Sequence, residues 1–254
     1  MKSSLKNIEK SRNSDKQIQW YNERLDFLAG MSNDPHTLIK EFSVFATRQN
    51  ITRFLETYEY WKLIKNIPGN ILECGVAGGS FLMSMAHFSS IYEPHHYTRK
   101  IIGFDTFKGF TKPDKKDLSS GAKHMHEGGL AYDSYDYLKK SIELFDGNRM
   151  IGNIPKVSLW KGDISNTLPN YLEQNPAAIV GMLHLDLDIY KPTKDVINMI
   201  KGRIPKGGII IFDEINHEDY PGETIAVMET LGINNLELQR VNESSMAAYV
   251  KFNL

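Results

Sequence analysis

The sequence predicts an α/β fold with a mainly parallel sheet flanked by helices, and three observations lead to this prediction. From Asn70 onward, short apolar runs that end in Gly or Asp alternate with windows of helical periodicity, which is the pattern of βαβ units. The first third of the chain carries helical periodicity alone. The length of 254 residues, with 41% hydrophobic and 24% charged residues, suits one such domain with additions.

Composition and charge exclude several classes of protein. The 30 Lys and Arg residues nearly balance the 31 Asp and Glu residues, so no overall basic field is available to bind nucleic acid or an anionic membrane. No apolar stretch approaches the roughly 18 residues of a membrane-spanning helix. The single cysteine, Cys74, excludes an intrachain disulfide, and no apolar secretion segment follows the N-terminus. We therefore expect a cytoplasmic protein.

The expected organisation has three parts. The polar residues 1–16 are expected to form a disordered tail, 17–66 an N-terminal helical segment, and 67–254 the sheet domain. Apolar residues of the helical segment recur at the spacing of one helix face. These helices cover the sheet or mediate self-association, and we expect a homo-oligomer. The helical windows of the segment are 17–29, 37–48 and 51–61.

Seven short apolar runs within the sheet domain are the expected strands. Helical windows follow most of them, so neighbouring strands are expected to pair in parallel. Later windows begin near residues 133, 165 and 223. The expected strands are 70–74, 101–105, 156–161, 179–186, 207–212, 235–241 and 246–252.

Residues 106–132 form a segment that is too long for an ordinary loop, since structureless loops beyond roughly 12–15 residues are uncommon in compact domains. The segment holds four glycines, five lysines and two histidines, with Phe107, Phe110 and Met125 interspersed. This composition favours a mobile lid that closes over a ligand. A plain flexible insertion is the alternative.

The first expected strand ends in Glu73 and continues through a glycine-rich turn into a Met-rich helix. Glycines let a ligand approach the backbone, and a helix N-terminus presents N–H groups, so nucleotide-like cofactors bind at such turns. Ala77 replaces the second glycine of the G-x-G-x-x-G pattern, which disfavours a dinucleotide. A carboxylate before the turn instead suits the ammonium group of S-adenosylmethionine; glycines that merely pack are the alternative. The candidate cofactor residues here are Glu73, Gly75, Val76, Gly78, Gly79 and Ser80.

Acidic residues also follow the next two strands. Asp105, with Thr106 and Phe107 after it, stands where the second strand of such a unit receives the ribose hydroxyls of a cofactor. Asp163, with Ile164 after it, can accept a hydrogen bond from an adenine amino group. Its alternative role is the N-cap of the helix that follows. We include these five residues in the candidate cofactor site.

The fourth and fifth strands are each followed by an acidic pair, Asp186 with Asp188 and Asp213 with Glu214. The carboxyl ends of adjacent parallel strands meet at one edge of the sheet, so these carboxylates are expected to converge and repel one another. Mg²⁺ or Mn²⁺ relieves that repulsion, because oxygen-only ligands suit a hard divalent cation. The nearby His184 is interpreted as a core histidine rather than a ligand.

Together these motifs resemble the class I S-adenosylmethionine-dependent methyltransferases of the TylF/MycF type, the macrocin O-methyltransferase family. The resemblance runs from about residue 50 to residue 252, and its motifs are specific in combination rather than singly. The motifs that carry it are ECGV with GG in 73–79, FDTF with GF in 104–110, GD in 162–163, LDLDIY with PT in 185–193, and the segment 205–214.

The resemblance implies a Rossmann-like fold, S-adenosylmethionine as methyl donor, and Mg²⁺ bound by Asp186, Asp213 and Glu214. It also implies that Asp188 is the general base and that Asp186 lies near the cofactor. Better-studied members carry Asp-Asp where this chain has Asp213-Glu214. The surroundings of this pair, residues 214–217 and 221–224, resemble a sub-branch that acts on sugars of natural products.

We therefore expect a metal-assisted O-methyltransferase that acts on a sugar hydroxyl of a nucleotide sugar or a natural-product glycoside. Two alternatives remain at this point. A metal-dependent glycosyltransferase also uses Asp-x-Asp, but it has no need of Glu73 before the glycine turn. A methyltransferase that acts on a small molecule other than a sugar would carry the same cofactor site.

Overall fold

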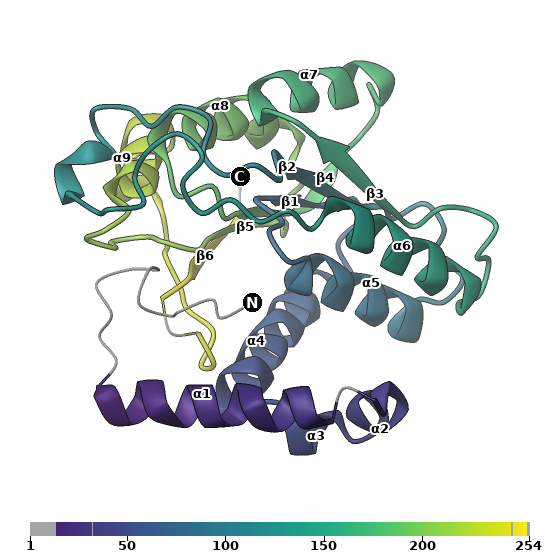
Figure 1. Cartoon of the computed structure of the whole chain (residues 1–254). Coiled ribbons are helices and arrows are strands. Elements are labelled where there is room, and N and C mark those ends of the chain that lie inside the picture. The colour runs from purple at the N-terminus through teal and green to yellow at the C-terminus, as the bar shows by residue number, and fades with distance from the viewer. Residues whose placement is uncertain (1–13, 32, 245, 253–254) are drawn as a thin grey trace.

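Six strands form the central sheet of the computed structural model, which describes residues 14–31, 33–244 and 246–252. The strand order is β3-β2-β1-β4-β5-β6, with β6 antiparallel to β5 and the other pairs parallel (Figure 1). The predicted α/β fold with a mainly parallel sheet is confirmed. The strands are β1 (Asn70–Cys74), β2 (Ile101–Asp105), β3 (Val157–Lys161), β4 (Val180–Leu185), β5 (Ile209–Phe212) and β6 (Ala248–Lys251).

Helices cover both faces of the sheet and form an apolar core on each side. One core includes Trp61, Leu82 and Leu138, and the other includes Leu168 and Val196. Because every strand from β1 to β5 except β3 is almost completely buried, these strands read as continuous apolar runs in the sequence. The first face carries α4 (Arg48–Ile64), α5 (Ser80–Tyr92) and α6 (Tyr135–Gly147), and the second carries α7 (Ile164–Gln174), α8 (Tyr190–Ile200) and α9 (Pro221–Thr230).

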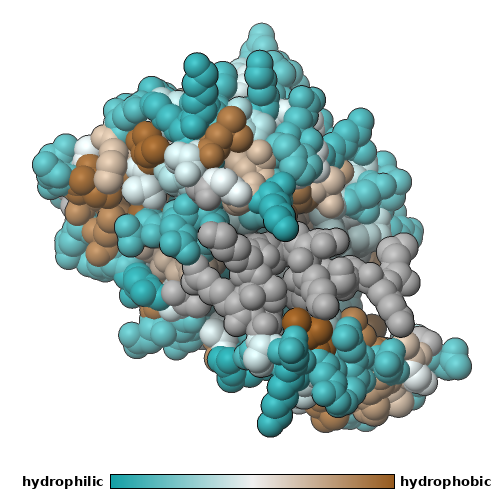
Figure 2. Space-filling view, turned by 60° about the vertical axis from the view of Figure 1, so that its left-hand side comes forward, coloured by the Kyte–Doolittle hydropathy of each residue, from teal (hydrophilic) through white to brown (hydrophobic). Residues whose placement is uncertain are grey.

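The N-terminal helices lie beside α4, away from the sheet (Figure 1). They are α1 (Asp15–Gly30), α2 (Pro35–Lys40) and α3 (Phe42–Phe45), so the window expected at 37–48 is split into short helices. Helix α1 begins inside the expected tail, and residues 1–13 lie outside the described residues. No described helix is long and apolar enough to cross a membrane; the cytoplasmic location stays a prediction. Figure 2 shows apolar side chains scattered between hydrophilic ones on the visible face.

The prediction of a strand at 235–241 is wrong. In this segment, a single antiparallel bridge joins Gln239 to Tyr249 of β6, and the described residues form no further ladder there. Leu236 and Leu238 alternate with polar residues as they would in a strand, but both pack against the apolar core. Side-chain burial therefore accounts for the alternation without strand pairing, and the sheet has six strands rather than the seven expected.

Parallel register brings the ends of four strands to one edge of the sheet. Cys74 at the end of β1 lies opposite Phe104 of β2 and Leu185 of β4, and Leu185 lies opposite Phe212 of β5. Gly75 of the glycine turn follows Cys74, and the acidic residues Asp105, Asp186 and Asp213 follow the other three positions. The topology thus places the candidate site residues at the carboxyl edge of the sheet.

The opposite edge of the sheet is held by a buried arginine. Arg99, 3% exposed, donates hydrogen bonds to the carbonyl oxygens of Gly69 (2.9 Å) and Ile67 (3.0 Å) and to the Glu93 carboxylate (2.8 Å). These contacts join the segment before β1 to the segment before β2. Removing the guanidinium would leave a partly buried carboxylate and two carbonyl groups without this donor.

We expect Arg99→Met to lower the free energy of unfolding by about 3 kcal/mol, because breaking a buried ion pair leaves an uncompensated charge. Urea denaturation followed by circular dichroism measures this change. The matched control is Lys62→Met, which breaks the exposed pair with Glu59 and is expected to cost less than about 1 kcal/mol. Equal losses in the two variants would contradict a structural role for the Arg99 network.

Candidate active site

A cavity of about 300 Å³ opens at the carboxyl edge of the sheet. Its walls come from the glycine turn after β1, the loops after β2 to β5, and the segment 106–132. The sequence-predicted residues that line it are Gly75, Asp105, Thr106, Asp163, Ile164, Asp186, Asp188 and Glu214. Those that do not line it are Glu73, Val76, Gly78, Gly79, Ser80, Phe107 and Asp213.

The glycine turn fits tightly against neighbouring segments. Gly75 has a φ of +94°, and a Cβ there would lie 1.7 Å from the carbonyl oxygen of Asp186. Gly79, with a φ of +80°, would place a Cβ 2.2 Å from the Leu138 side chain. Packing alone therefore requires glycine at these two positions. Gly75 also faces the cavity, and its contact with a cofactor stays a prediction.

Asp105 holds the turn in place. Its Oδ2 accepts hydrogen bonds from the N–H groups of Val76 (2.7 Å) and Ala77 (2.8 Å), and its Oδ1 accepts one from Phe107 (2.6 Å). Ala77 and Phe107 both have positive φ, which costs a non-glycine residue free energy. The three hydrogen bonds offset that cost. The carboxylate also lines the cavity, where the predicted contact with ribose hydroxyls would be made.

Asp163 caps helix α7, and its contact with an adenine amino group stays a prediction. Its Oδ1 accepts a hydrogen bond from the N–H of Ser165 at 2.8 Å, so it is the N-cap of α7. It also lines the cavity together with Gly162 and Ile164. Glu73 does not line the cavity, and its contact with the cofactor stays a prediction. It is 2% exposed behind the glycine turn, outside the cavity lining, where burial raises the pKa of its carboxyl group.

Three carboxylates face one another inside the cavity. Asp186, Asp188 and Glu214 each offer an oxygen, and these oxygens lie within 4.8 Å of one another. Burial, reinforced by repulsion between the acids, raises the pKa of Asp186 and of Glu214. Asp188 lies in the tight turn before α8, and its φ of +61° is an uncommon backbone conformation for a residue other than glycine.

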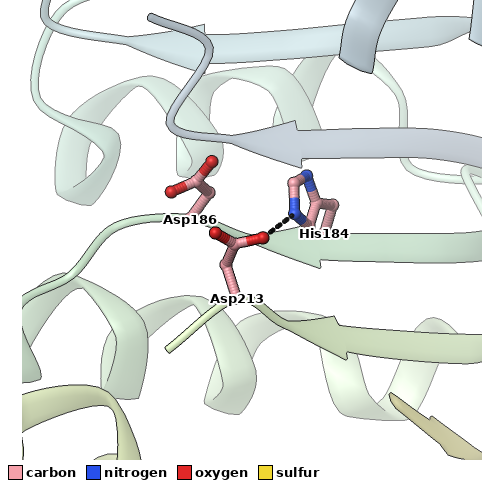
Figure 3. Close-up of side chains that lie close together, drawn as sticks. All are labelled: His184, Asp186 and Asp213. Carbon is pink, nitrogen blue, oxygen red and sulfur yellow. Dashed lines mark ion pairs between the residues drawn. The ribbon is translucent and has the colours of Figure 1, made fainter. Parts of the chain in front are cut away.

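Asp213 lies with a second group of side chains (Figure 3). Its Oδ1 is 3.5 Å from His184 Nε2 and 3.2 Å from Nη2 of Arg53, and Arg53 also approaches Asp186 Oδ2 at 3.7 Å. Burial alone would raise the pKa of Asp213, but the two cations lower it below its ordinary value. The residues Asp186, Asp213 and His184 form the second group whose ligand atoms lie within 4.8 Å.

Two residues of this site were not found from the sequence. Arg53 comes from α4, far from the acids in sequence, and the pattern of α4 indicates only an amphipathic helix. Glu223, fully buried at the start of α9, accepts a hydrogen bond from the N–H of Glu214 at 2.9 Å and so fixes the loop after β5. His184 is 1% exposed, as expected of a core histidine, and its ring stacks on Phe81.

The segment 106–132 is folded over the cavity. Phe107 and Met125 are buried in separate apolar clusters, and the backbones of Phe110, Gly128 and Gly129 are joined by two hydrogen bonds. The segment contributes Gly109, Phe110 and Leu130 among others to the cavity wall. The segment 106–132 therefore forms a packed cover over the cavity, and we refer to it as the cover. Its opening and closing stay a prediction.

Comparisons with known proteins agree with this geometry. Residues 47–234 match the macrocin-O-methyltransferase (TylF) family. The chain belongs to the macrocin-O-methyltransferase family. Among curated proteins, no sequence matches this chain.

Solved structures support the same conclusion. The chain resembles the calicheamicin methyltransferase CalS11 with a TM-score of 0.89 and 28% identity over 94% of this chain and 93% of that chain. It resembles apo CalS11, described as TDP-rhamnose 3′-O-methyltransferase, with a TM-score of 0.80 and 27% identity over 94% of this chain and 95% of that chain. NovP, an O-methyltransferase, shares the fold at a TM-score of 0.61 and 18% identity over 80% and 81% of the two chains.

Family membership makes the protein an enzyme that transfers a methyl group. The resemblance drawn from the sequence is thereby confirmed. The Asp-x-Asp glycosyltransferase is no longer a competing interpretation. The individual site residues stay predictions that the geometry supports to different degrees.

We expect Asp105→Ala to weaken S-adenosylhomocysteine binding at least about tenfold, because it removes charge-assisted hydrogen bonds to the cofactor and to the turn. Isothermal titration calorimetry measures the dissociation constant. Asp26→Ala, an exposed aspartate of α1, is the control and is expected to leave affinity unchanged. Unchanged affinity in a folded Asp105→Ala protein would remove Asp105 from the cofactor site.

Proposed function

We propose that the protein methylates a sugar hydroxyl with S-adenosylmethionine, assisted by a divalent cation. The observation that carries the proposal is that Asp186, Asp188 and Glu214 share one cavity with the glycine turn and Asp105. The cavity therefore joins a cofactor surface to a cluster of acids. The similarity to a protein described as a TDP-rhamnose 3′-O-methyltransferase supports a nucleotide sugar or a related glycoside as acceptor.

The acids fit a hard divalent cation. Their donors in the cavity are carboxylate oxygens, and Glu214 Oε2 is a buried atom with no hydrogen-bond partner among the described residues. Asp186 and Glu214 would hold Mg²⁺ or Mn²⁺. Asp213 would complete the set of metal ligands that the family implies if its ion pairs with Arg53 and His184 break when the cation binds. When bound, the cation lowers the pKa of a sugar hydroxyl and neutralises the acids.

Asp188 is the general base in this proposal. It lines the cavity, and its carboxylate lies within 4.8 Å of those of Asp186 and Glu214. The sugar oxygen attacks the methyl carbon, the new O–C bond forms as the C–S bond breaks, and the hydroxyl proton passes to Asp188. S-adenosylhomocysteine and the methylated sugar leave. A cover that excludes water and holds the reacting atoms in line supports this displacement.

A panel of acceptors tests the reaction itself. The protein is incubated with methyl-labelled S-adenosylmethionine and, separately, nucleotide sugars, natural-product glycosides and catechol-type small molecules. Label is expected on a sugar oxygen, located by mass spectrometry of fragments. Label found only on the molecules that are not sugars would replace the sugar in this proposal and leave methyl transfer intact.

The N-terminal helices support the predicted homo-oligomer. Large apolar side chains on them are exposed, including Trp20, Phe27, Phe42 and Val44, each at 50% or more. A second copy of the chain is the partner we propose for this surface. Sedimentation velocity of the purified protein is expected to show a species larger than the 29.0 kDa chain.

Chelation is expected to stop methyl transfer while sparing cofactor binding, because the proposed metal ligands and the glycine turn are different residues. Turnover is measured after exhaustive EDTA treatment and again after adding back Mg²⁺ or Mn²⁺, with S-adenosylhomocysteine affinity measured in parallel. Full turnover in metal-free protein would contradict the metal site, and the acids would then need another explanation.

Asp188→Asn keeps the shape of the side chain but removes its basicity, so we expect kcat to fall by about 10²–10⁴-fold with cofactor affinity preserved. The measurement is made at saturating Mg²⁺. A deficit that further metal rescues would instead place Asp188 among the metal ligands. Asp195→Asn, a partly exposed acid within α8, is the control, with little expected change.

A further inference from the structure

Helix α8 begins two residues after Asp188 and has no N-cap from its own sequence. Its N-cap residue is Ile189, whose side chain makes no capping hydrogen bond. Helices ordinarily begin after Ser, Thr, Asp or Asn, because the first N–H groups of a helix have no partners within the helix. The start of α8 therefore depends on a partner from another part of the chain.

Asp117 of the segment 106–132 is that partner. Its Oδ1 accepts a hydrogen bond from the N–H of Tyr190 at 2.8 Å, and its Oδ2 accepts one from the N–H of Asp114 at 2.6 Å. Asp117 is fully buried. A carboxylate at this place also interacts favourably with the positive end of the helix dipole. The cap of α8 thus comes from 73 positions earlier in the chain.

The hydrogen bond between Asp117 and Tyr190 is closely packed by its neighbours. Gly222 of α9 lies against it, and a Cβ at that position would be 1.8 Å from Asp117 Oδ1 and 2.5 Å from the nitrogen of Tyr190. Three segments therefore meet at one point: the cover, the start of α8 and the start of α9. Displacing the cover would break the hydrogen bond to Tyr190, and a side chain at Gly222 would clash with it.

An exposed group of charges surrounds the buried contact. Glu229 of α9 accepts from Lys116 (2.5 Å), Lys194 (2.8 Å) and the hydroxyl of Tyr190 (2.6 Å), and the ammonium of Lys116 lies 3.8 Å from the centre of the Tyr190 ring. Exposed pairs of this kind contribute little each. They add to the docking of the cover beside Asp117 without replacing it.

We propose that Asp117 is a positioning residue that couples the docking of segment 106–132 to the placement of Asp188. The inference rests on the proposed role of Asp188 as base. Asp188 sits in a tight turn, in which the N–H of Ile189 donates to the carbonyl of Leu187 at 2.6 Å, and the start of α8 fixes the far end of that turn. When the cover is docked, it both closes the cavity and holds this turn.

In such an enzyme, the Asp188 carboxylate takes its position as base only when the cover is closed. Lifting the cover removes the acceptor from the Tyr190 N–H and frees the first turn of α8. Asp188 then loses its fixed position at the moment when water can enter the cavity. A closed cover and a placed base therefore occur together, which limits deprotonation to the closed state.

The test compares Asp117→Ala and Gly222→Ala with Asp114→Asn in the full chain. Asp114→Asn alters the same segment but leaves the cap of α8 in place, so it is the matched control. Hydrogen exchange of residues 186–194 and tryptic cleavage within 106–132 are measured without substrate. Both are expected to rise about tenfold in the first two variants and to change little in the control.

Kinetics supply the second readout. In Asp117→Ala, kcat is expected to fall about tenfold, while S-adenosylhomocysteine affinity stays within about threefold, because the glycine turn and Asp105 are untouched. A lower melting temperature with unchanged kcat and unchanged exchange at 186–194 would make Asp117 a stabilising residue only and overturn the proposal. If Asp117→Ala does not fold, Gly222→Ala decides by the same criteria.

The two proposals fail in different ways. Absence of methyl transfer to any sugar, or an Asp188→Asn variant with full kcat, would refute the proposed function. Exchange and cleavage report on the coupling between the cover and α8 without any turnover. Unchanged exchange at 186–194 in both Asp117→Ala and Gly222→Ala would refute the coupling even in an enzyme that methylates sugars.

Discussion

Repulsion between carboxylates at the end of the parallel sheet is the constraint on which the site depends. Parallel pairing of β4 with β5 brings Asp186 and Asp213 to the same edge, and the residues beside them add Asp188 and Glu214. Two unit charges 4 Å apart interact by roughly 4 kcal/mol at an effective dielectric constant of 20. A cluster of this kind exists in a folded protein only if cations or protons compensate its charge.

The chain supplies part of that compensation itself. Arg53 and His184 neutralise Asp213, and Arg53 reaches Asp186 as well. This ion pairing joins α4 to the carboxyl edge of the sheet. On the cavity side, Glu214 Oε2 is buried and has no hydrogen-bond partner among the described residues, and for that reason we assign the metal to this side of the cluster.

The sequence predicted the sheet better than the site. The bounds of β1 and β2 agree with expectation, because buried parallel strands read as short apolar runs that end at Gly or Asp. The same reasoning failed at 235–241, since Leu236 and Leu238 bury their side chains without pairing their backbone. Periodicity reports which side chains are buried, and it does not report which backbone groups are paired.

The site residues that sequence reasoning missed act through contacts distant in the chain. Arg53 lies 160 positions before Asp213, and no local pattern links them. Glu73, expected at the cofactor, lies buried behind the turn with its Oε1 3.8 Å from Nδ1 of His184, and the sequence gives no sign of this contact. The type of acid at each strand end was readable from the sequence. Which acids face the cavity depends on side-chain packing that only the assembled fold determines.

The three helices that follow the acidic loops, α7, α8 and α9, differ in how their N-termini are capped. Asp163 caps α7 from the ordinary position, directly before its helix, whereas the N-caps of α8 and α9, Ile189 and Tyr220, make no capping hydrogen bond. The acidic residues of those two loops face the cavity or its edge instead. Carboxylates from other segments accept hydrogen bonds from these loops. Asp117 of the cover accepts from the N–H of Tyr190, and Glu223 in the first turn of α9 accepts from the N–H of Glu214. Both helices therefore begin without a cap from their own N-cap residue, and the long-range contact from Asp117 joins the cover to the loop that carries the proposed base.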